Sequence, residues 1–255
     1  MIPKKIHQIY LQGFDSLDPD YVELIIKMKE INPEWTYKIY SEKDIMLYIK
    51  ENFDSNILES YKKINPIYPA ARADFFRYLI LYNEGGFYID VKSFPSKPLD
   101  SIISDEDKFI VCQWDREIYP TYGLHKEIDY VENGEYQQWN IMCEKKSPIM
   151  RDVINGVVYN INNYSIFKQG VARKGVLRTT GPIVFTEKVY EYRRDEGVKI
   201  FSSNMEPGIV YSMKNHLLAN HYSNINLPVI KGNIFEEIIS RLLISPLKKI
   251  KNLFH

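Results

Sequence analysis

Charged side chains at short, regular spacing mark the segment Ala70–Ser93, AARADFFRYLILYNEGGFYIDVKS. Asp74 and Arg77 are three residues apart, so on a helix they lie on one face. Asp90 comes shortly afterwards, behind a run of apolar residues. Carboxylates accept hydrogen bonds from hydroxyl groups, and a guanidinium stabilises developing negative charge on a phosphate. The alternative is a helical ion pair that contributes only about 0.2–0.5 kcal/mol.

The elements that must hold these side chains can be predicted from the same segment. The apolar run that follows Arg77 predicts a helix, and Gly85-Gly86 predicts its end. Phe87 to Val91 has the composition of a buried strand. Asp90 is therefore expected at the carboxyl end of a strand, where open α/β sheets bind their ligands.

The first hundred residues alternate between strand and helix patterns. Asp18-Pro19 predicts a helix N-cap and first turn, and Ser41–Asp44 resembles a capping box. This order predicts an α/β protein with a mostly parallel, helix-covered sheet. The predicted strands are Lys5–Leu11, Trp35–Tyr40 and Phe87–Val91, and the predicted helices are 19–31, one starting at Ser41, 57–64 and one over the segment of Asp74.

The pattern is less regular after Asp90. Residues 115–136 mix Pro, Gly, Asn and Tyr and predict a loop or short hairpin near the site, of the kind that often serves as a lid. Arg173, Lys174 and Arg178 are interpreted as a basic loop or as solvated charges. The other predicted elements are strands at Phe109–Trp114, Gln138–Met142, near Ile200 and Ile209–Met213, and helices at Pro148–Ile161 and Ile183–Tyr192.

Composition limits the class of protein. The 255 residues carry 33 basic and 33 acidic side chains, so no broad positive surface for nucleic acid is expected. Two cysteines, Cys112 and Cys143, are too few for a secreted disulfide framework and favour reduced thiols in a cytoplasmic protein. The N-terminal residues lack the apolar core of a signal peptide, and no apolar run approaches the roughly 20 residues of a membrane span.

The last residues have a different pattern. In the segment 233–255, apolar residues recur at helical spacing beside Lys248, Lys249 and Lys251. A basic amphipathic segment of this kind can lie on a membrane surface, which predicts a peripheral protein on the inner face of the plasma membrane. A terminal helix docked on the core and a dimer contact are the alternatives.

The chain resembles glycosyltransferase family 32, which contains Och1-like α-mannosyltransferases and related bacterial capsule and lipooligosaccharide enzymes. The resemblance begins at IPKKIHQIY and is most specific at ARADFFRYLILYNEGGFYID. Weaker likeness continues at Gln138–Asn140, at Thr180–Pro182 and at the late histidines. The family implies a GT-A fold in which a Rossmann-like nucleotide-binding sheet is merged with an acceptor-binding half. We expect residues 1–100 to form the nucleotide-sugar half and 101–232 the acceptor half, followed by the tail 233–255.

The family also implies transfer of a sugar from a nucleotide-sugar with retention of configuration. By position, Asp74 and Arg77 would hold the donor sugar and diphosphate, and Asp90 would be the first acid of an Asp-x-Asp motif. The further positions that the resemblance assigns to the donor are His7, Gln8, Ile9, Arg72 and His221, and those that it assigns to the acceptor side are Asn140 and Thr180.

For three of these residues, a purely structural role is an open alternative to a role in binding. His7 is equally well explained as a satisfied strand histidine, and His221 as a histidine of a surface loop. Asn140 is equally well explained as a residue that caps a turn at the end of a strand.

The sequence departs from the family at Lys92, where the second acid of the motif is expected. An ammonium cannot bind Mn²⁺ or Mg²⁺, but it can itself stabilise the diphosphate. A metal, if one is used, would be bound by Asp90 and His221. We therefore expect a retaining hexosyltransferase, with a UDP-sugar donor favoured, that extends a cell-surface polysaccharide or lipid-linked glycan without needing a metal. The alternative is a non-catalytic sugar-nucleotide-binding protein with a degraded motif.

Overall fold

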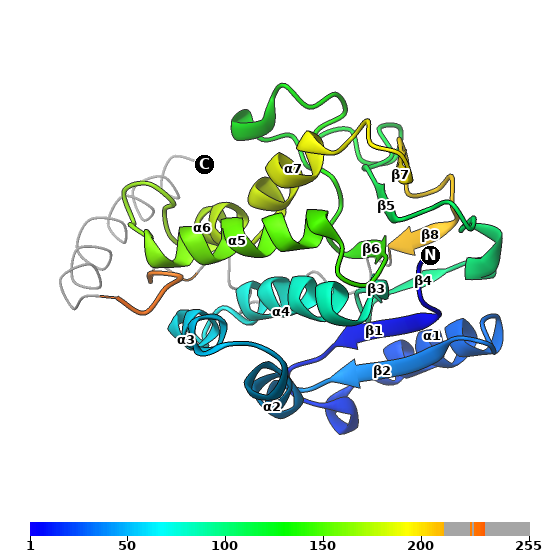
Figure 1. The fold of residues 1–255 in the computed structure, drawn as a ribbon, viewed down its shortest axis with the longest axis horizontal. Coiled ribbons are helices and arrows are strands. Elements are labelled where there is room, and N and C mark those ends of the chain that lie inside the picture. The colour runs from blue at the N-terminus through cyan, green and yellow to red at the C-terminus, as the bar shows by residue number, and fades with distance from the viewer. Residues whose placement is uncertain (212–224, 226, 233–255) are drawn as a thin grey trace, which may run out of the picture.

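A computed structural model describes residues 1–211, 225 and 227–232 (Figure 1). His216, His221 and the tail 233–255, with the predictions made for them, lie outside these residues. Among the described helices, none combines the length and the apolar character that crossing a membrane requires.

Helices and strands alternate through the first half of the chain. The helices are α1 (Pro19–Glu30), α2 (Glu42–Asn52), α3 (Ser55–Lys63), α4 (Pro69–Glu84), α5 (Pro148–Asn162), α6 (Ala172–Thr179) and α7 (Pro182–Glu191). The strands are β1 (Lys5–Ile9), β2 (Thr36–Tyr40), β3 (Gly86–Ile89), β4 (Ser93–Pro95), β5 (Phe109–Cys112), β6 (Asn140–Cys143), β7 (Val198–Phe201) and β8 (Ile209–Tyr211).

The central sheet has the order β2-β1-β3-β6-β5-β7 in the described part of the chain. β1 is parallel to both β2 and β3, and β5 is parallel to β7, while β6 is antiparallel to both of its neighbours. The predicted mostly parallel α/β sheet is therefore confirmed. Because β6 runs in reverse, its first residue, Asn140, pairs with Ile89 at the end of β3. The segment before β6 thus meets the carboxyl ends of the parallel strands.

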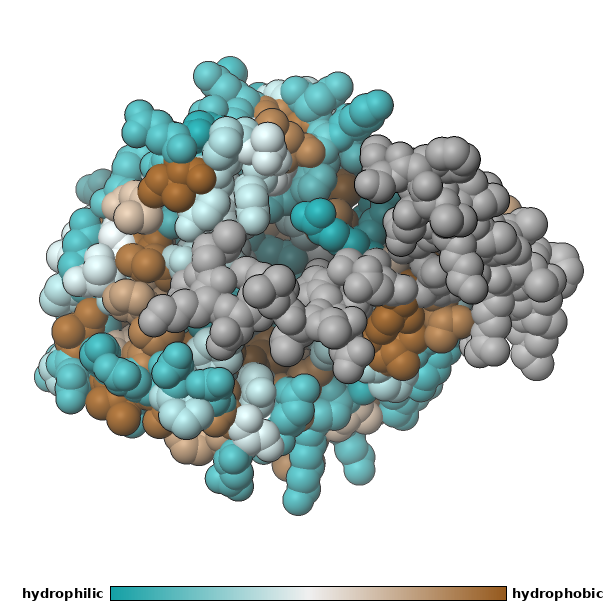
Figure 2. Space-filling model, turned by 180° about the vertical axis from the view of Figure 1, so that it is seen from behind, coloured by the Kyte–Doolittle hydropathy of each residue, from teal (hydrophilic) through white to brown (hydrophobic). Residues whose placement is uncertain are grey.

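Each face of the sheet is buried by a different layer. In β3, Tyr88 belongs to the larger hydrophobic cluster with residues of α4, α5 and α7, while Phe87 and Ile89 belong to a second cluster with Met28 of α1 and Ile209 of β8. Figure 1 shows α4 and α5 side by side along one face. The opposite view shows a hollow near the middle of the molecule with hydrophilic side chains around it (Figure 2).

Local signals placed several helix starts correctly. Asp18 caps α1, and the side chain of Ser41 forms the predicted capping box with Asp44. The predicted basic loop at Arg173, Lys174 and Arg178 is wrong, because all three residues lie in helix α6; Arg173 and Lys174 are exposed, as the alternative of solvated charges expects. Gly175 lowers the helix propensity of this segment. A Cβ at Gly175 would lie 2.7 Å from the carbonyl oxygen of Gly170, so close packing requires the glycine.

The irregular segment between β5 and β6 is held by a buried carboxylate. Within it, only the single 3-10 turn Lys126–Ile128 is regular, so the predicted loop is confirmed. The Glu135 carboxylate accepts a hydrogen bond from Nε1 of Trp114 at 2.8 Å and contacts Nε2 of His125 at 2.7 Å. These contacts fix the loop at both of its ends.

The sharp break between α4 and β3 depends on two glycines. Gly85 has φ 65° and ψ −166°, a combination essentially restricted to glycine, and Gly86 has φ 98°. A Cβ at Gly86 would lie 2.4 Å from the carbonyl oxygen of Lys5, in the neighbouring strand. The break therefore brings β3 against β1 more closely than any other residue type allows.

We predict that Gly86→Ala destabilises the fold much more than Gly170→Ala. Gly170 also has a positive φ, but the nearest atom to its Cβ would be 3.7 Å away. The control should lose about 1–2 kcal/mol of unfolding free energy from backbone strain. Gly86→Ala adds a clash with backbone and should lose at least about 2 kcal/mol more. Urea denaturation measures both; equal losses would contradict this account.

Candidate functional site

Arg77 and Asp74 form a buried ion pair on α4. Nη2 of Arg77 lies 3.0 Å from Oδ1 of Asp74, and the two residues are 5% and 2% exposed. Nη1 donates to the carbonyl oxygen of Gln138 at 2.8 Å, and the guanidinium lies over the ring of Tyr88. The alternative interpretation as a helical ion pair is therefore confirmed in its geometry, but the pair is buried and not a weak surface pair. Two buried charges this close stabilise the fold only while each remains paired.

The Asp74 carboxylate takes its other hydrogen bonds from distant segments. Oδ1 accepts from Nε2 of Gln138, and Oδ2 accepts from Oγ1 of Thr180, both at 3.0 Å. Burial raises the pKa of Asp74 to about 7, against the opposing effect of Arg77 and both hydrogen bonds. The carboxylate thus depends on Arg77 to stay ionised. Its contacts make it a residue that orients Arg77, Gln138 and Thr180.

Asp90 directly follows β3, as predicted, and is only partly buried. Its Oδ1 accepts from the hydroxyl of Tyr88 at 2.7 Å and lies 3.8 Å from Nη2 of Arg77. Its backbone is fixed as well, because its N–H donates to Trp139 and its carbonyl accepts from Gln8. Oδ2 accepts no hydrogen bond from the described residues. One carboxylate oxygen is therefore held in place while the other is available to a ligand.

Lys92 lies beside this group, half-buried, at the turn between β3 and β4. Its Nζ is 4.7 Å from the centre of the Tyr211 ring, and it forms no ion pair with the described residues. Burial lowers the pKa of Lys92; Asp90 opposes this effect and Arg77 adds to it. A desolvated ammonium of this kind gains strongly from an anionic partner.

Aromatic side chains form the wall next to Lys92. The ring centres of Trp139 and Tyr211 are 4.9 Å apart, and Trp114 lies 5.5 Å from Tyr211 on the same wall. The buried Nε1 of Trp139 has no hydrogen-bond partner among the described residues. A buried donor without a partner costs free energy, and a polar ligand would supply the missing acceptor.

Two predicted donor residues have structural contacts instead. Nε2 of His7 lies 2.9 Å from the carbonyl oxygen of Gly85, at the end of β3 opposite to Asp90, and burial lowers the pKa of His7 to about 4. Arg72 pairs with Glu42 and donates to the carbonyl oxygen of Ile64. His7 is therefore a neutral strand histidine, and Arg72 could reach a donor only by leaving these contacts.

The remaining predicted residues divide between the site and its surroundings. Gln8 reaches the site through its bond to Asp90, whereas Ile9 is buried in the larger hydrophobic cluster. Asn140 is buried and donates to Gln137 at 2.8 Å. Thr180, predicted on the acceptor side, contacts Asp74 instead, because its loop leads into α7 beside α4.

Sequence reasoning missed four residues of the site: Tyr88, Gln138, Trp139 and Tyr211. Tyr88 could have been found, because it precedes Asp90 by two residues and so shares its side of the strand. Gln138 and Trp139 lie within a stretch of family likeness that carries no local signal of its own. Nothing in the sequence around Tyr211 indicates a contact with Lys92.

The donor set can be compared with the needs of a divalent cation. Mn²⁺ and Mg²⁺ prefer carboxylate and other oxygen ligands. Both oxygens of Asp74 are engaged, Asp90 offers one, and Lys92 is a cation. Among the described residues, no three acidic, histidine or cysteine side chains gather as a metal site. The described residues therefore offer such a cation one carboxylate oxygen, from Asp90, and no site built from protein ligands alone.

Comparisons with known proteins agree with the predicted family. Residues 19–109 match the family model described as a glycosyltransferase sugar-binding region containing a DXD motif. The initiation-specific α-1,6-mannosyltransferase of Candida albicans is 26% identical over 212 residues, which cover 74% of this chain and 53% of that protein. An uncharacterized glycosyltransferase of Acanthamoeba polyphaga mimivirus is 26% identical over 228 residues, covering 84% and 77% of the two chains.

The fold has a counterpart among solved structures. The PaToxG glycosyltransferase superposes with a TM-score of 0.53 at 21% identity, over 74% of this chain and 69% of that one. The GT-A-type fold and the resemblance to family 32 are therefore confirmed. The chain spans only about half the length of the Candida relative.

We predict that Asp74→Asn costs about 3–5 kcal/mol of unfolding free energy, because it leaves the buried Arg77 charge without its partner. Glu59→Gln is the matched control: Glu59 and Lys62 have the same spacing but are exposed, so its cost should stay below about 0.5 kcal/mol. Urea denaturation of both variants gives the comparison. A small loss for Asp74→Asn would show that the pair behaves like a surface ion pair.

Proposed function

We propose that this family 32-type chain is a retaining glycosyltransferase that uses a nucleotide-sugar donor. The observation that carries the proposal is the position of Arg77, which lies between Asp74 and Asp90 and holds the second carboxylate at the end of β3. Asp90 then presents a free oxygen to the hydroxyl groups of a sugar or ribose. A UDP-sugar remains the expected donor, and the mannosyl transfer in the name of the Candida relative makes GDP-mannose the alternative to test.

Lys92 supplies the positive charge that a diphosphate leaving group requires. It stands two residues after Asp90, where the family places its second acid, so an ammonium takes the place of a carboxylate there. As the bond between the sugar and the diphosphate breaks, negative charge grows on the phosphate oxygens. An ammonium fixed beside that position stabilises the transition state more than the ground state.

Retention can proceed on a single face of the sugar. The acceptor hydroxyl would attack as the diphosphate leaves, and the leaving diphosphate would take the hydroxyl proton. A double displacement instead needs a free carboxylate nucleophile. Both oxygens of Asp74 accept hydrogen bonds, and one oxygen of Asp90 is held by Tyr88. Because Asp74 is fully engaged and the free oxygen of Asp90 is assigned to a hydroxyl of the sugar or ribose, we favour the single-face route.

The acceptor and the location are proposed from the family resemblance and from the sequence of the tail. A cell-surface polysaccharide or lipid-linked glycan fits the family resemblance. A position at the inner face of the plasma membrane rests on the sequence of the tail 233–255 alone. The competing proposal is a protein that binds a nucleotide-sugar without turning it over, and the substitution at Lys92 is the feature in its favour.

We predict that Lys92→Met lowers donor hydrolysis at least about 100-fold, the effect of removing one group that stabilises the transition state. Hydrolysis of UDP- and GDP-sugars is measured with EDTA and again with Mn²⁺. Lys146→Met is the control, because Lys146 also lies over a tyrosine ring, at 4.6 Å from Tyr82. The thermal midpoints should show that both variants fold.

Three results would count against parts of this proposal. Wild-type rates in Lys92→Met would exclude the role of Lys92. Turnover that requires Mn²⁺ would support an enzyme that uses a metal, and it would exclude Lys92 as the replacement for that metal. Nucleotide binding without turnover, under every condition and with acceptors added, would favour the binding protein.

A further inference from the structure

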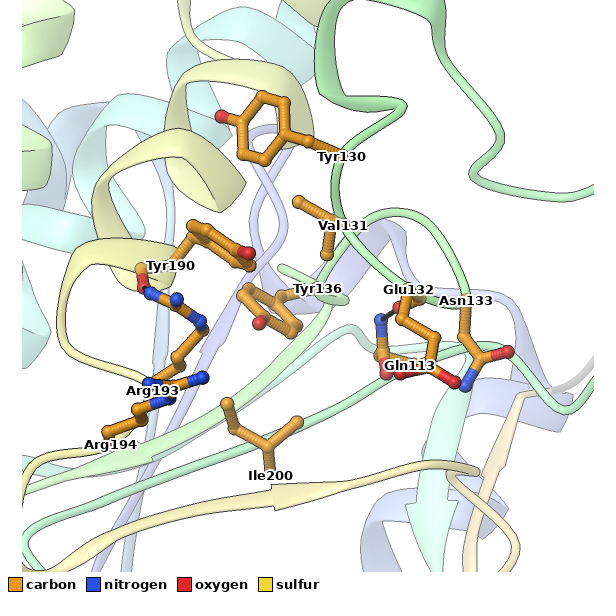
Figure 3. A pocket seen from close by; sticks show the side chains of 10 residues that line it. All are labelled: Gln113, Tyr130, Val131, Glu132, Asn133, Tyr136, Tyr190, Arg193, Arg194 and Ile200. Atoms are coloured by element: carbon orange, nitrogen blue, oxygen red, sulfur yellow. Dashed lines mark hydrogen bonds between the residues drawn. The ribbon is translucent and has the colours of Figure 1, made fainter.

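A cavity lies at the far end of α7 from Thr180. Its volume is about 460 Å³, and it is open to solvent. Figure 3 shows the arginines on one side of the Tyr136 ring and the polar residues of the loop on the other. The lining residues are Gln113, Tyr130, Val131, Glu132, Asn133, Tyr136, Tyr190, Arg193, Arg194 and Ile200.

Three tyrosines give this cavity aromatic faces with polar tips. Tyr136 is only 4% exposed, and its backbone N–H donates to the Thr186 hydroxyl of α7, which fixes the chain at this point. Tyr130 and Tyr190 pack edge to face at 5.1 Å. None of the three phenolic hydroxyls forms a hydrogen bond with the described residues. Aromatic rings with free hydroxyl groups suit a flat, polyhydroxylated ligand.

Two arginines add positive charge to the same wall. The Arg193 guanidinium stacks 3.7 Å from the centre of the Tyr190 ring, and its Nη1 donates to the Tyr190 carbonyl at 2.8 Å. Its other guanidinium N–H groups donate no hydrogen bond to the described residues. Arg194 is exposed and forms no ion pair with the described residues. Glu132 is the lining carboxylate, and it lies on the opposite side of Tyr136 (Figure 3). The arginine side therefore favours an anionic group.

The chain connects this cavity with the donor site. Tyr136 is two residues from Gln138, so their Cα atoms are at most about 7 Å apart. Helix α7 starts directly after Thr180, which bonds to Asp74, and Tyr190 lies ten residues further along. At a rise of about 1.5 Å per residue, Tyr190 lies roughly 15 Å from Thr180, and Arg193 and Arg194 follow just beyond the end of the helix. A short oligosaccharide spans that distance.

We propose that this cavity, here called the tyrosine–arginine pocket, binds an anionic saccharide as part of the acceptor. A sugar ring packs against Tyr130, which is 51% exposed, and a carboxylate or phosphate on the saccharide pairs with Arg193 and Arg194. The assignment to the acceptor rests on the proposed transferase function. The pocket then selects acceptors that carry an acidic sugar several units from the hydroxyl that reacts.

The test compares charged and neutral saccharides of matched shape. Cellobiouronic acid is paired with cellobiose, and mannose 6-phosphate with mannose, and each is titrated into the full chain by calorimetry. The variants are Arg194→Gln, Arg193→Gln/Arg194→Gln and Tyr136→Phe. Arg151→Gln is the control, because Arg151 is exposed on α5, outside the pocket. Donor hydrolysis is followed in every variant.

We expect a charged saccharide to bind at least about tenfold more tightly than its neutral partner, as one charge-assisted hydrogen bond predicts. The double variant should remove that preference, Arg194→Gln should reduce it, and Arg151→Gln should preserve it. Tyr136→Phe should weaken both members of a pair equally. Donor hydrolysis should not change. Whichever of the two charged probes binds more tightly identifies the acidic group as a carboxylate or a phosphate.

Any of three results would overturn the proposal for the pocket. These are equal affinity for charged and neutral saccharides, unchanged binding in the double variant, and no binding of any probe. These results do not depend on the donor site. If the wild type turns over no donor but binds a charged saccharide through the arginines, the transferase proposal fails, and the pocket stands as a carbohydrate site.

Discussion

Most of the site depends on the cost of burying the Arg77 guanidinium. A buried cation must be paired and hydrogen-bonded, because the cost of removing it from water otherwise destabilises the folded state. Asp74 pairs with it directly, Gln138 accepts from it, and Tyr88 covers its face. These partners come from α4, β3 and the segment before β6. The pair lies on α4 alone, but its charges can be buried with all their partners only when the sheet edge is assembled.

That assembled edge gives the exposed groups their positions. Asp90 is held by Arg77 and Tyr88 on one oxygen and by two backbone bonds, so its free oxygen has a fixed direction. Lys92 stands close by on the Tyr211 ring. A rigid, partly desolvated arrangement loses little conformational entropy when a ligand binds. Such preorganisation is the condition for stabilising developing charge. The same reasoning links the donor site to α7, because Thr180 both bonds to Asp74 and precedes that helix.

Local sequence signals were enough for the part of the site that lies on one continuous segment. The spacing of Asp74 and Arg77, the two glycines and the apolar strand together predicted helix, break and Asp90 correctly. The partners Gln138 and Thr180 lie 64 and 106 residues from Asp74, and no local pattern reports such contacts. His7 was ambiguous for a related reason, since a polar strand residue can face either a ligand or the neighbouring backbone. Helix α6 was missed because Gly175, needed for close packing, resembles a loop residue.

A crystal structure with the intact donor, or with its nucleoside diphosphate, tests the central claim most directly. Our account predicts that Nζ of Lys92 lies within hydrogen-bond distance of a diphosphate oxygen. It also predicts that Oδ2 of Asp90 contacts the ribose or sugar while Asp74 keeps its bonds to Arg77 and Thr180. A divalent cation bridging Asp90 and the diphosphate, with Lys92 turned away, would contradict the account. So would a diphosphate bound at another edge of the sheet.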